Sequence, residues 1–332
     1  MEKIRVMIVG YGNVGRGVLA SLRNNPDFEL AGVVSRSPER VKRELSDVPV
    51  MDVKDIEGWK RELRPDVAIL CGGSKDDLPK QGPEFVRHLT TVDSFDNHSR
   101  IPEYFATMDR AAQEAGHVSV ISTGWDPGIF SLERTLANAF VPGVRAYGFY
   151  GLGPKGGLSM GHSDALRTIP GVKDARQFTH AVPEAIERVR RGENPAFEPG
   201  DMHTRECFVV LEEGADKEAI TKTILEMPGY FAPYKTTVNF ISQEELNTKY
   251  KGFPHDGLVV AAGSTGKGNP ALVEYRCQWG SNPEATANVL VAHARAAVRL
   301  AREGRKGAFT ILDIPATYFS TLSREELLKH WM

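Results

Sequence analysis

The chain has 332 residues, of which 41% are hydrophobic and 25% are charged, and its net charge is −2. These values are typical of a globular protein long enough for two domains with separate cores, and they exclude the collagen-like and disordered classes. The near balance of charge gives no reason to expect a nucleic acid or an anionic membrane as partner. A small-molecule substrate is therefore favoured.

The cysteines and the start of the chain indicate a cytoplasmic protein. Cys71, Cys207 and Cys277 are odd in number and far apart, so neither a disulfide framework nor a metal site is predicted. The first apolar run begins within a few residues of Met1, so we expect no signal sequence. No later run of about 18 apolar residues predicts a membrane span.

A glycine-rich turn follows the first apolar run, residues 4–9, and precedes a helical pattern. Gly10, Gly12 and Gly15 fit Gly-x-Gly-x-x-Gly, where the first glycine permits the turn, the second admits a pyrophosphate, and the third lets helix and strand pack closely. The N-terminus of the helix would then face the phosphates. This setting predicts dinucleotide binding, and an ordinary tight turn is the alternative.

The residues after the second predicted strand, 29–34, indicate which dinucleotide binds. A ribose-binding residue is expected here, about 20 residues after the last glycine. An acidic residue would accept from a ribose 2′-hydroxyl, but the chain has Ser35, Arg36 and Ser37. A cation between two hydroxyl groups favours the 2′-phosphate of NADP, unless Arg36 is only a solvated surface residue.

Further strands and helices alternate as far as residue 121. Predicted strands cover 48–51, 66–71, 90–92 and 118–121, and predicted helices cover 38–45, 56–63, 84–89 and 102–115. The carboxyl ends of parallel strands are where open α/β sheets bind ligands, although each loop there could be a plain turn. Asp93, Asp96 and Asp126 follow such strands, where carboxylates also cap helices.

The pattern changes after residue 129. A helix to about residue 139 precedes strands at 143–150, 174–180, 206–211, 236–241, 257–263 and 271–279, with helices at 184–191 and 217–226. Residues 151–157 are glycine-rich and predict a loop that can move. A helix from Asn282 to Gly304 and a strand at 309–314 end the chain. The predicted fold class is α/β, a Rossmann-type doubly wound parallel sheet with a second α+β domain carrying a largely antiparallel sheet.

Several motifs together resemble the meso-diaminopimelate dehydrogenase family. They lie at residues 10–16, 91–98, 122–128 and 161–165, and similar segments follow at 205–210, 238–241 and 254–255. The resemblance covers essentially the whole chain in order. It implies a homodimer that catalyses reversible, NADP-dependent oxidative deamination of the D-centre of meso-2,6-diaminopimelate to L-2-amino-6-oxopimelate and ammonia.

The resemblance also implies a division into domains. Residues 1–122 would form the dinucleotide-binding domain, to which residues 283–320 return. Residues 123–282 would bind substrate and form the dimer.

The resemblance assigns roles to individual residues. Asp96 and Asp126 would hold the reacting ammonium, and Trp125, Phe149 and Tyr150 would line that end of the substrate. Arg205, Thr179, His255 and Asn282 would hold the carboxylate and ammonium of the far, L-configured centre, and Met160 and Gly161 complete the substrate set. The cofactor set is Gly10, Tyr11, Gly12, Asn13, Val14, Ser35, Arg36, Ser37, Cys71, Gly72, Gly73, Ser74, Asp93 and Ser94.

Two departures from the family pattern concern the reacting end of the substrate. The 151–157 segment is longer than the family's short connection, with Tyr150 where Trp is usual, and Met160 replaces the usual Gln. A broader-specificity D-amino acid dehydrogenase is therefore one alternative. Arg205 and His255 argue against it, because a monocarboxylic substrate would leave them unpaired. A non-catalytic NADP-binding sensor is another, and the carboxylates Asp96 and Asp126 argue against that.

Overall fold

A computed structural model describes residues 3–332. The chain forms two compact units, the first comprising Met1–Leu132 with Pro283–Met332 and the second Glu133–Asn282. The division falls inside helix α6 (Ile129–Phe140), ten residues after the position expected from the sequence. Among residues 3–332, no helix combines the length and hydropathy that a membrane crossing requires.

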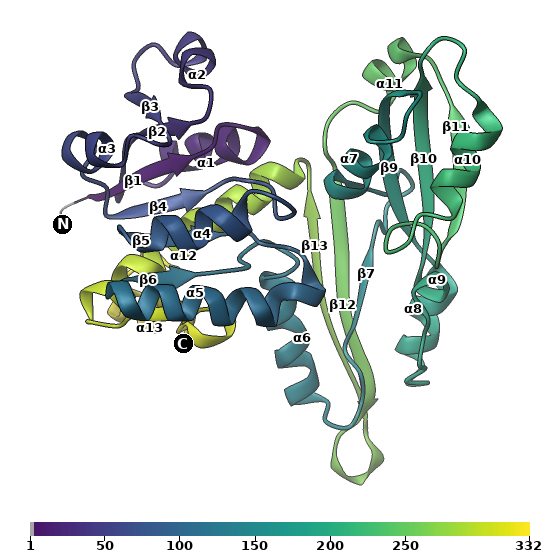
Figure 1. Ribbon diagram of the computed structural model, residues 1–332. Coiled ribbons are helices and arrows are strands. Elements are labelled where there is room, and N and C mark those ends of the chain that lie inside the picture. The colour runs from purple at the N-terminus through teal and green to yellow at the C-terminus, as the bar shows by residue number, and fades with distance from the viewer. Residues whose placement is uncertain (1–2) are drawn as a thin grey trace. The chain divides into compact units, whose positions relative to one another are not determined.

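The first unit contains a seven-stranded sheet in which every pairing is parallel (Figure 1). Its spatial order is β14-β6-β5-β4-β1-β2-β3, so the strand order reverses between β1 and β4. The strands are β1 (Ile4–Val9), β2 (Phe28–Ser35), β3 (Val50–Asp52), β4 (Val67–Leu70), β5 (Thr90–Asp93), β6 (Val118–Val120) and β14 (Gly307–Phe309). Ligands bind at such a reversal in open α/β sheets.

Helices cover both faces of this sheet, which confirms the doubly wound class. One face packs on α1 (Asn13–Arg23) and α12 (Asn282–Arg302), and the other packs on α3 (Ile56–Glu62), α4 (Leu78–Val86) and α5 (Ile101–Ala115). The strands are therefore apolar on both sides, as the fully buried β4 illustrates. The α1–α12 contact requires small residues, because a Cβ at Gly17 would lie 2.9 Å from that of Ala287. The remaining helices are α2 (Pro38–Glu44) and α13 (Arg324–Trp331).

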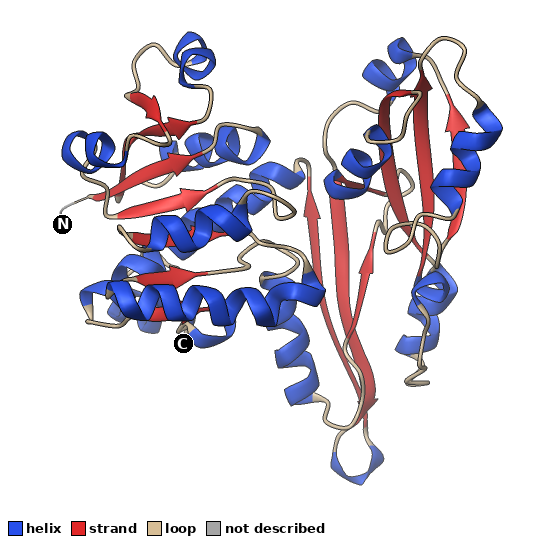
Figure 2. Cartoon of the chain, in the orientation of Figure 1, coloured by secondary structure: helices blue, strands red, loops and turns tan. Residues whose placement is uncertain are grey.

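The second unit contains two sheets (Figure 2), one ordered β11-β10-β9-β8 and the other β13-β12-β7. Only the β10–β11 pairing is parallel, so the prediction of a largely antiparallel unit is confirmed. The strands are β7 (Tyr147–Tyr150), β8 (Gly157–Ser159), β9 (Val172–Ala181), β10 (His203–Leu211), β11 (Lys235–Phe240), β12 (His255–Ser264) and β13 (Pro270–Trp279). The helices are α7 (Met160–Arg167), α8 (Pro183–Arg190), α9 (Pro199–Met202), α10 (Lys217–Leu225) and α11 (Gln243–Lys249).

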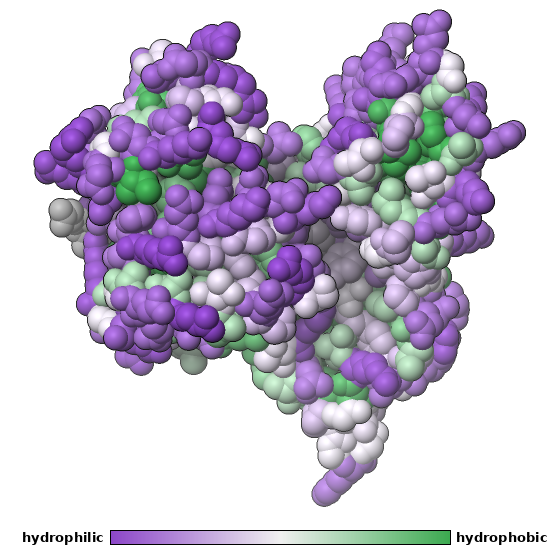
Figure 3. Space-filling view, viewed as in Figure 1, coloured by the Kyte–Doolittle hydropathy of each residue, from purple (hydrophilic) through white to green (hydrophobic). Residues whose placement is uncertain are grey.

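Some predicted boundaries were wrong. Helix α4 begins at Leu78 instead of 84, with a proline in its first turn and Pro83 inside it, although proline disfavours the interior of a helix. The last strand ends at Phe309, because the Thr310 side chain accepts a hydrogen bond from the Leu312 N–H and starts a 3-10 helix. Elements β8, α7, α9, α11 and α13 were not predicted. The surface of both units is mainly hydrophilic in the view of Figure 3.

Candidate active site

The turn between β1 and α1 has the backbone geometry that phosphate binding needs. Gly10 has a φ of +90°, and a Cβ at Gly15 would lie 2.3 Å from the carbonyl oxygen of Gly10. Gly12, by contrast, has no atom within 4 Å of an added Cβ, and as the N-cap it offers no side chain to the first N–H groups of α1. These N–H groups and the positive end of the helix therefore suit a pyrophosphate.

A cavity of about 280 Å³ lies beside this turn in the first unit. It combines residues predicted from the sequence with the polar residues Arg40, Asp77 and Gln81 and the apolar residues Val9, Val34 and Val53, which were not predicted. Its lining consists of Val9, Gly10, Tyr11, Gly12, Val34, Ser35, Arg36, Ser37, Arg40, Val53, Cys71, Gly72, Gly73, Asp77 and Gln81.

The cavity contains two guanidinium groups and one buried acceptor. Arg36 Nη1 lies 2.9 Å from Asp77 Oδ1, and Arg40 Nη2 donates to the Tyr11 carbonyl at 3.4 Å. Gln81 Oε1 is buried and has no hydrogen-bond partner among residues 3–332. Burial raises the pKa of the Cys71 thiol to about 12, which keeps it neutral. The cavity therefore fits an anionic dinucleotide with donors at its phosphates and an acceptor within the pocket.

The prediction that Asp93 contacts the cofactor needs correction, because its side chain is completely buried. Its carboxylate accepts hydrogen bonds from Phe95 N (2.9 Å), Ser122 N (3.1 Å) and the Tyr104 hydroxyl (2.8 Å). It thereby holds Ser122 at its positive φ of 56°. Burial raises the pKa of Asp93 to about 6, against the opposing effect of these donors.

Asp93 links the two loops that carry the predicted catalytic carboxylates. The loop after β5 contains exposed Asp96, whose N–H donates to Ser74 Oγ at 3.1 Å. The loop after β6 contains half-buried Asp126 beside buried Trp125. Both carboxylates follow parallel strands at the carboxyl edge of one sheet, as expected. Of the other predicted cofactor residues, Asn13 and Val14 begin α1, and Ser94 follows β5.

In the second unit, neighbouring strands bring Arg205 and Thr179 together, because these residues are directly paired between β10 and β9. Arg205 is only 9% exposed, and one of its N–H groups donates to Thr179 Oγ1. Gln177 Nε2 donates to the same oxygen at 3.4 Å. Since Thr179 Oγ1 accepts twice, its own hydrogen can point to a third acceptor.

Arg205 is a buried cation with no carboxylate partner among residues 3–332. Its Nε has no hydrogen-bond partner, and burial lowers the pKa of the guanidinium, opposed by Tyr234. Removing a charge from water is costly unless a counter-charge is supplied. The Arg205–Thr179 pair is thus suited to an incoming carboxylate.

Tyr150 is held beside this pair by two other side chains. Its N–H donates to His203 Nε2 at 3.0 Å, its ring stacks on His203 at 5.2 Å between centroids, and its hydroxyl accepts from Arg134. Burial lowers the pKa of His203 to about 3, so this imidazole stays neutral.

Phe149 needs a correction. Expected to line the substrate, its ring is instead fully buried among apolar residues of α8 and β12, because alternate β7 side chains face this core.

The structure also places the remaining predicted substrate residues, His255, Asn282, Met160 and Gly161. Buried His255 begins β12 and lies edge-on to Tyr150, with ring centroids 6.4 Å apart. Asn282 is 8% exposed, and its N–H donates to the Phe253 carbonyl at 2.7 Å. Met160 and Gly161 begin α7, where Met160 is half-buried and Gly161 is exposed.

The glycine-rich segment after β7 is tied at its start. The Asp256 carboxylate accepts from Leu152 N at 2.8 Å and from Gly153 N at 3.1 Å. At the other end, a Cβ at Gly157 would lie 2.5 Å from the His255 ring. Only Pro154 and Lys155 are exposed, so any mobility is confined to the tip.

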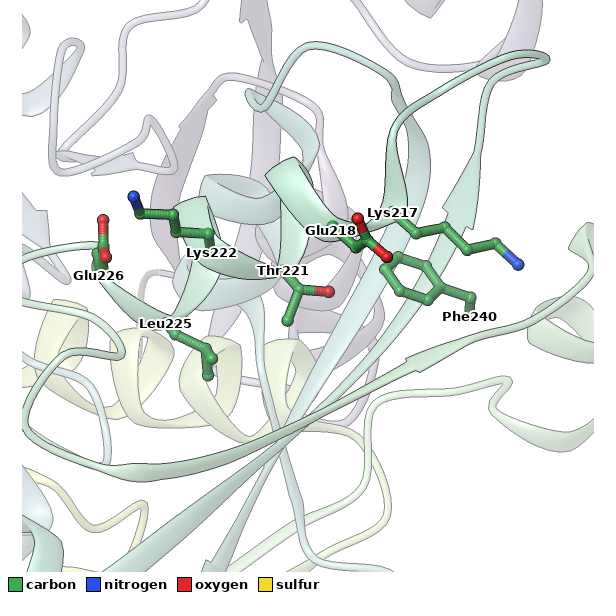
Figure 4. A pocket seen from close by; sticks show the side chains of 7 residues that line it. All are labelled: Lys217, Glu218, Thr221, Lys222, Leu225, Glu226 and Phe240. Atoms are coloured by element: carbon green, nitrogen blue, oxygen red, sulfur yellow. The ribbon is translucent and has the colours of Figure 1, made fainter.

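A larger groove, of about 440 Å³, lies on the second unit and is a poor candidate (Figure 4). It is formed by α10 and by Phe240 of β11, and its charged residues Lys217, Glu218, Lys222 and Glu226 are exposed. Nothing in it resembles a catalytic arrangement. Within residues 3–332 no group of His, Cys, Asp or Glu side chains could hold a metal ion.

Sequence reasoning missed Arg40, Asp77, Gln81, Arg134, His203 and Tyr234. Arg40 carried a weak signal, since it lies in the first turns of a helix that follows the ribose-binding residues. The others depend on pairings between distant segments. Tyr234 reaches Arg205 only because β11 pairs with β10, with Thr236 opposite Arg205.

The fold and the phosphate-binding turn define a nicotinamide-dinucleotide-dependent oxidoreductase. In agreement, residues 4–93 match the family described as "Oxidoreductase family, NAD-binding Rossmann fold", and residues 124–281 match "Diaminopimelic acid dehydrogenase C-terminal domain". The chain is 49% identical to the meso-diaminopimelate D-dehydrogenase of Ureibacillus thermosphaericus, over 99% of each chain. The chain therefore belongs to the meso-diaminopimelate dehydrogenase family.

Solved structures agree with this assignment. The diaminopimelate (DAP) dehydrogenase of Corynebacterium glutamicum in complex with DAP is 41% identical and matches with a TM-score of 0.93 over 100% of both chains. An engineered D-amino acid dehydrogenase bound to NADP⁺ is 40% identical, with a TM-score of 0.88 over 99% of this chain and 100% of the other.

Proposed function

We propose that the protein catalyses reversible, NADP-dependent oxidative deamination of the D-centre of meso-2,6-diaminopimelate, giving L-2-amino-6-oxopimelate and ammonia. The observation that carries the proposal is Arg205, a buried cation with unused donors and no carboxylate partner among the described residues, in a chain of this family. A substrate with a second carboxylate supplies the missing counter-charge.

Different residues would recognise the two ends of the substrate. Asp96 and Asp126 would hold the ammonium at the reacting centre, with Trp125 and Tyr150 shielding it from water. Thr179, Arg205, His255 and Asn282 would hold the distal carboxylate and ammonium, and Met160 and Gly161 would complete the substrate site. When bound, the nicotinamide supplies the hydride acceptor. The protein's contribution is then the orientation of the Cα–H and the exclusion of water.

NADP is favoured over NAD by the two guanidinium groups in the cavity. Arg36 and Arg40 both line it, and no acidic residue ends β2 where a ribose 2′-hydroxyl would need an acceptor. The NADP⁺-bound relative supports the same choice.

The inferred assembly rests on the resemblance, and the inferred location rests on the cysteines. We infer a homodimer, to be checked by analytical ultracentrifugation. We also infer a cytoplasmic location, consistent with three unpaired cysteines at Cys71, Cys207 and Cys277.

One assay tests the proposed reaction. NADPH formation is measured on meso-diaminopimelate, on its LL isomer and on several simple D-amino acids. Turnover of the meso isomer alone supports the proposal. Comparable rates on simple D-amino acids would favour the broader-specificity alternative, and cofactor binding without any turnover would favour a sensor.

A further inference from the structure

The guanidinium of Arg205 contacts an aromatic ring that the reaction does not use. Arg205 Cζ lies over the Tyr234 ring, 4.0 Å from its centre. Tyr234 is half-buried and comes from the segment between α10 and β11, far from the other substrate-binding residues in the sequence.

The position of Tyr234 is fixed by the fold. Its N–H donates to the carbonyl of Phe231 at 2.9 Å, and the Phe231 ring is fully buried in an apolar cluster with Ile220 and Ile224 of α10. Two residues after Tyr234, Thr236 pairs with Arg205 in the β10–β11 ladder. The ring is therefore held over Arg205 by a buried anchor on one side and by strand pairing on the other.

An aromatic partner has a specific consequence for this buried arginine. A carboxylate partner would use the N–H donors at the edge of the guanidinium and would neutralise its charge. A ring over the face attracts the cation but leaves its in-plane donors available. Here one donor engages Thr179 and the buried Nε has no partner among residues 3–332, so the donors of the guanidinium are not all satisfied within the protein.

We propose that Tyr234 is a specificity-determining residue, which holds the Arg205 guanidinium by its face so that its edge can bind the distal carboxylate of the substrate. This inference rests on the proposed function. Tyr234 acts through Arg205 and takes no part in hydride transfer. Its loss should therefore weaken substrate binding without slowing the chemical step.

Two variants test the inference. Tyr234→Leu removes the aromatic face, and Tyr234→Phe retains it while removing the hydroxyl. Binding of meso-diaminopimelate to the full-length protein is measured by calorimetry, and KM and kcat are measured with NADP. We expect Tyr234→Leu to raise Kd and KM at least fivefold with kcat within threefold of wild type, and Tyr234→Phe to behave like wild type.

Tyr230→Leu is the matched control. Tyr230 lies in the same segment, but its ring contacts His162, with centroids 5.2 Å apart. Its replacement perturbs the segment without removing the ring over Arg205, so Kd should change less than twofold. Melting temperatures of all variants verify folding, and if Tyr234→Leu does not fold, Tyr234→Met replaces it.

Several results would overturn the inference. These are a rise in Kd below fivefold for the Leu variant, an equal rise for Tyr234→Phe, or an equal rise for Tyr230→Leu. Failure of the proposed function has a different signature, since the wild-type protein would then bind meso-diaminopimelate without forming NADPH, or would not bind it.

Discussion

Arg36 and Asp77 form an ion pair in the cofactor cavity, with Nη1 and Oδ1 2.9 Å apart. The Arg36 side chain is 69% exposed, so the pair contributes at most about 1 kcal/mol. A charge-assisted bond to a phosphate is worth about 1.5–3 kcal/mol. A 2′-phosphate should therefore displace Asp77 from Arg36.

Asp77→Asn should tighten NADP binding. The amide can still accept from Gly73 N, as Asp77 Oδ2 does at 3.1 Å, but it no longer competes for Arg36. We expect the Kd of NADP to fall by up to about fivefold, the equivalent of 1 kcal/mol, with that of NAD unchanged. Fluorescence titration with each cofactor measures both. Equal weakening for the two cofactors would mean that Asp77 serves only to fix the loop.

Arg36→Ala should have the opposite effect on selectivity. Losing the charge-assisted contact should weaken NADP binding by about 1–3 kcal/mol while NAD is hardly affected. Titration with 2′,5′-ADP and with 5′-AMP isolates the adenosine end. An unchanged ratio of the two affinities would assign the phosphate to Arg40 instead.

Asp126→Asn should separate turnover from cofactor binding. The substitution keeps the shape of the side chain and removes the charge proposed to hold the reacting ammonium. We expect kcat/KM to fall about 100-fold, or about 2.7 kcal/mol, while the Kd of NADP stays within twofold. Ser131→Ala provides a control on the neighbouring helix. Near-normal turnover in Asp126→Asn would remove this carboxylate from the site.

Much of the first unit could be predicted from the sequence, because its signals are local. The motif formed by Gly10, Gly12 and Gly15 is recognisable within six residues. The strands around it are continuous apolar runs. The environment of Arg205 could not be predicted in the same way. Its contacts with Thr179 and Tyr234 depend on the registers of β9, β10 and β11, which no short stretch encodes. Resemblance located Thr179, but nothing indicated Tyr234.

Asp93 was assigned to the cofactor set, whereas its carboxylate is buried and accepts hydrogen bonds from the protein itself. A carboxylate at a strand end looks the same in sequence whether it faces a ligand or the protein interior. Only the fold shows that Phe95, Ser122 and Tyr104 surround it.

Asp93→Asn should change how stability depends on pH. The folded protein raises the pKa of Asp93 from 3.8 to about 6, so it binds this proton more tightly than the unfolded chain. The resulting stabilisation is complete below pH 3.8 and is lost as the pH rises through 6, amounting to roughly 3 kcal/mol. The variant has no carboxyl group to titrate at this position, so its stability does not fall in this way as the pH rises. Its amide can lie against the Tyr104 hydroxyl, which can instead donate to the Leu78 carbonyl.

Urea unfolding at pH 4 to 7 measures the effect. The free energy of unfolding of the variant, relative to wild type, should rise between pH 4 and pH 7 by roughly 2.4 kcal/mol. A constant difference across this range would show that Asp93 is ionised throughout in the folded state.

Arg205→Met should discriminate between substrates. Without its counter-charge, the distal carboxylate of meso-diaminopimelate should bind about 2–5 kcal/mol less well. Simple D-amino acids lack that carboxylate, so their kcat/KM should hold or rise. Parallel loss on both classes together with a lower melting temperature would make Arg205 a structural residue.

The segment after β7 is attached to the protein at both ends, which affects how members of this family can differ in sequence there. Asp256 fixes Leu152 and Gly153 at one end, and at the other Gly157 packs against His255, so both ends are constrained while Pro154 and Lys155 are exposed. Residues can be added or removed at this tip without disturbing either attachment. Evolution, or a designer grafting a new loop, can therefore alter what the enzyme accepts beside Tyr150 while the sheet beneath stays the same.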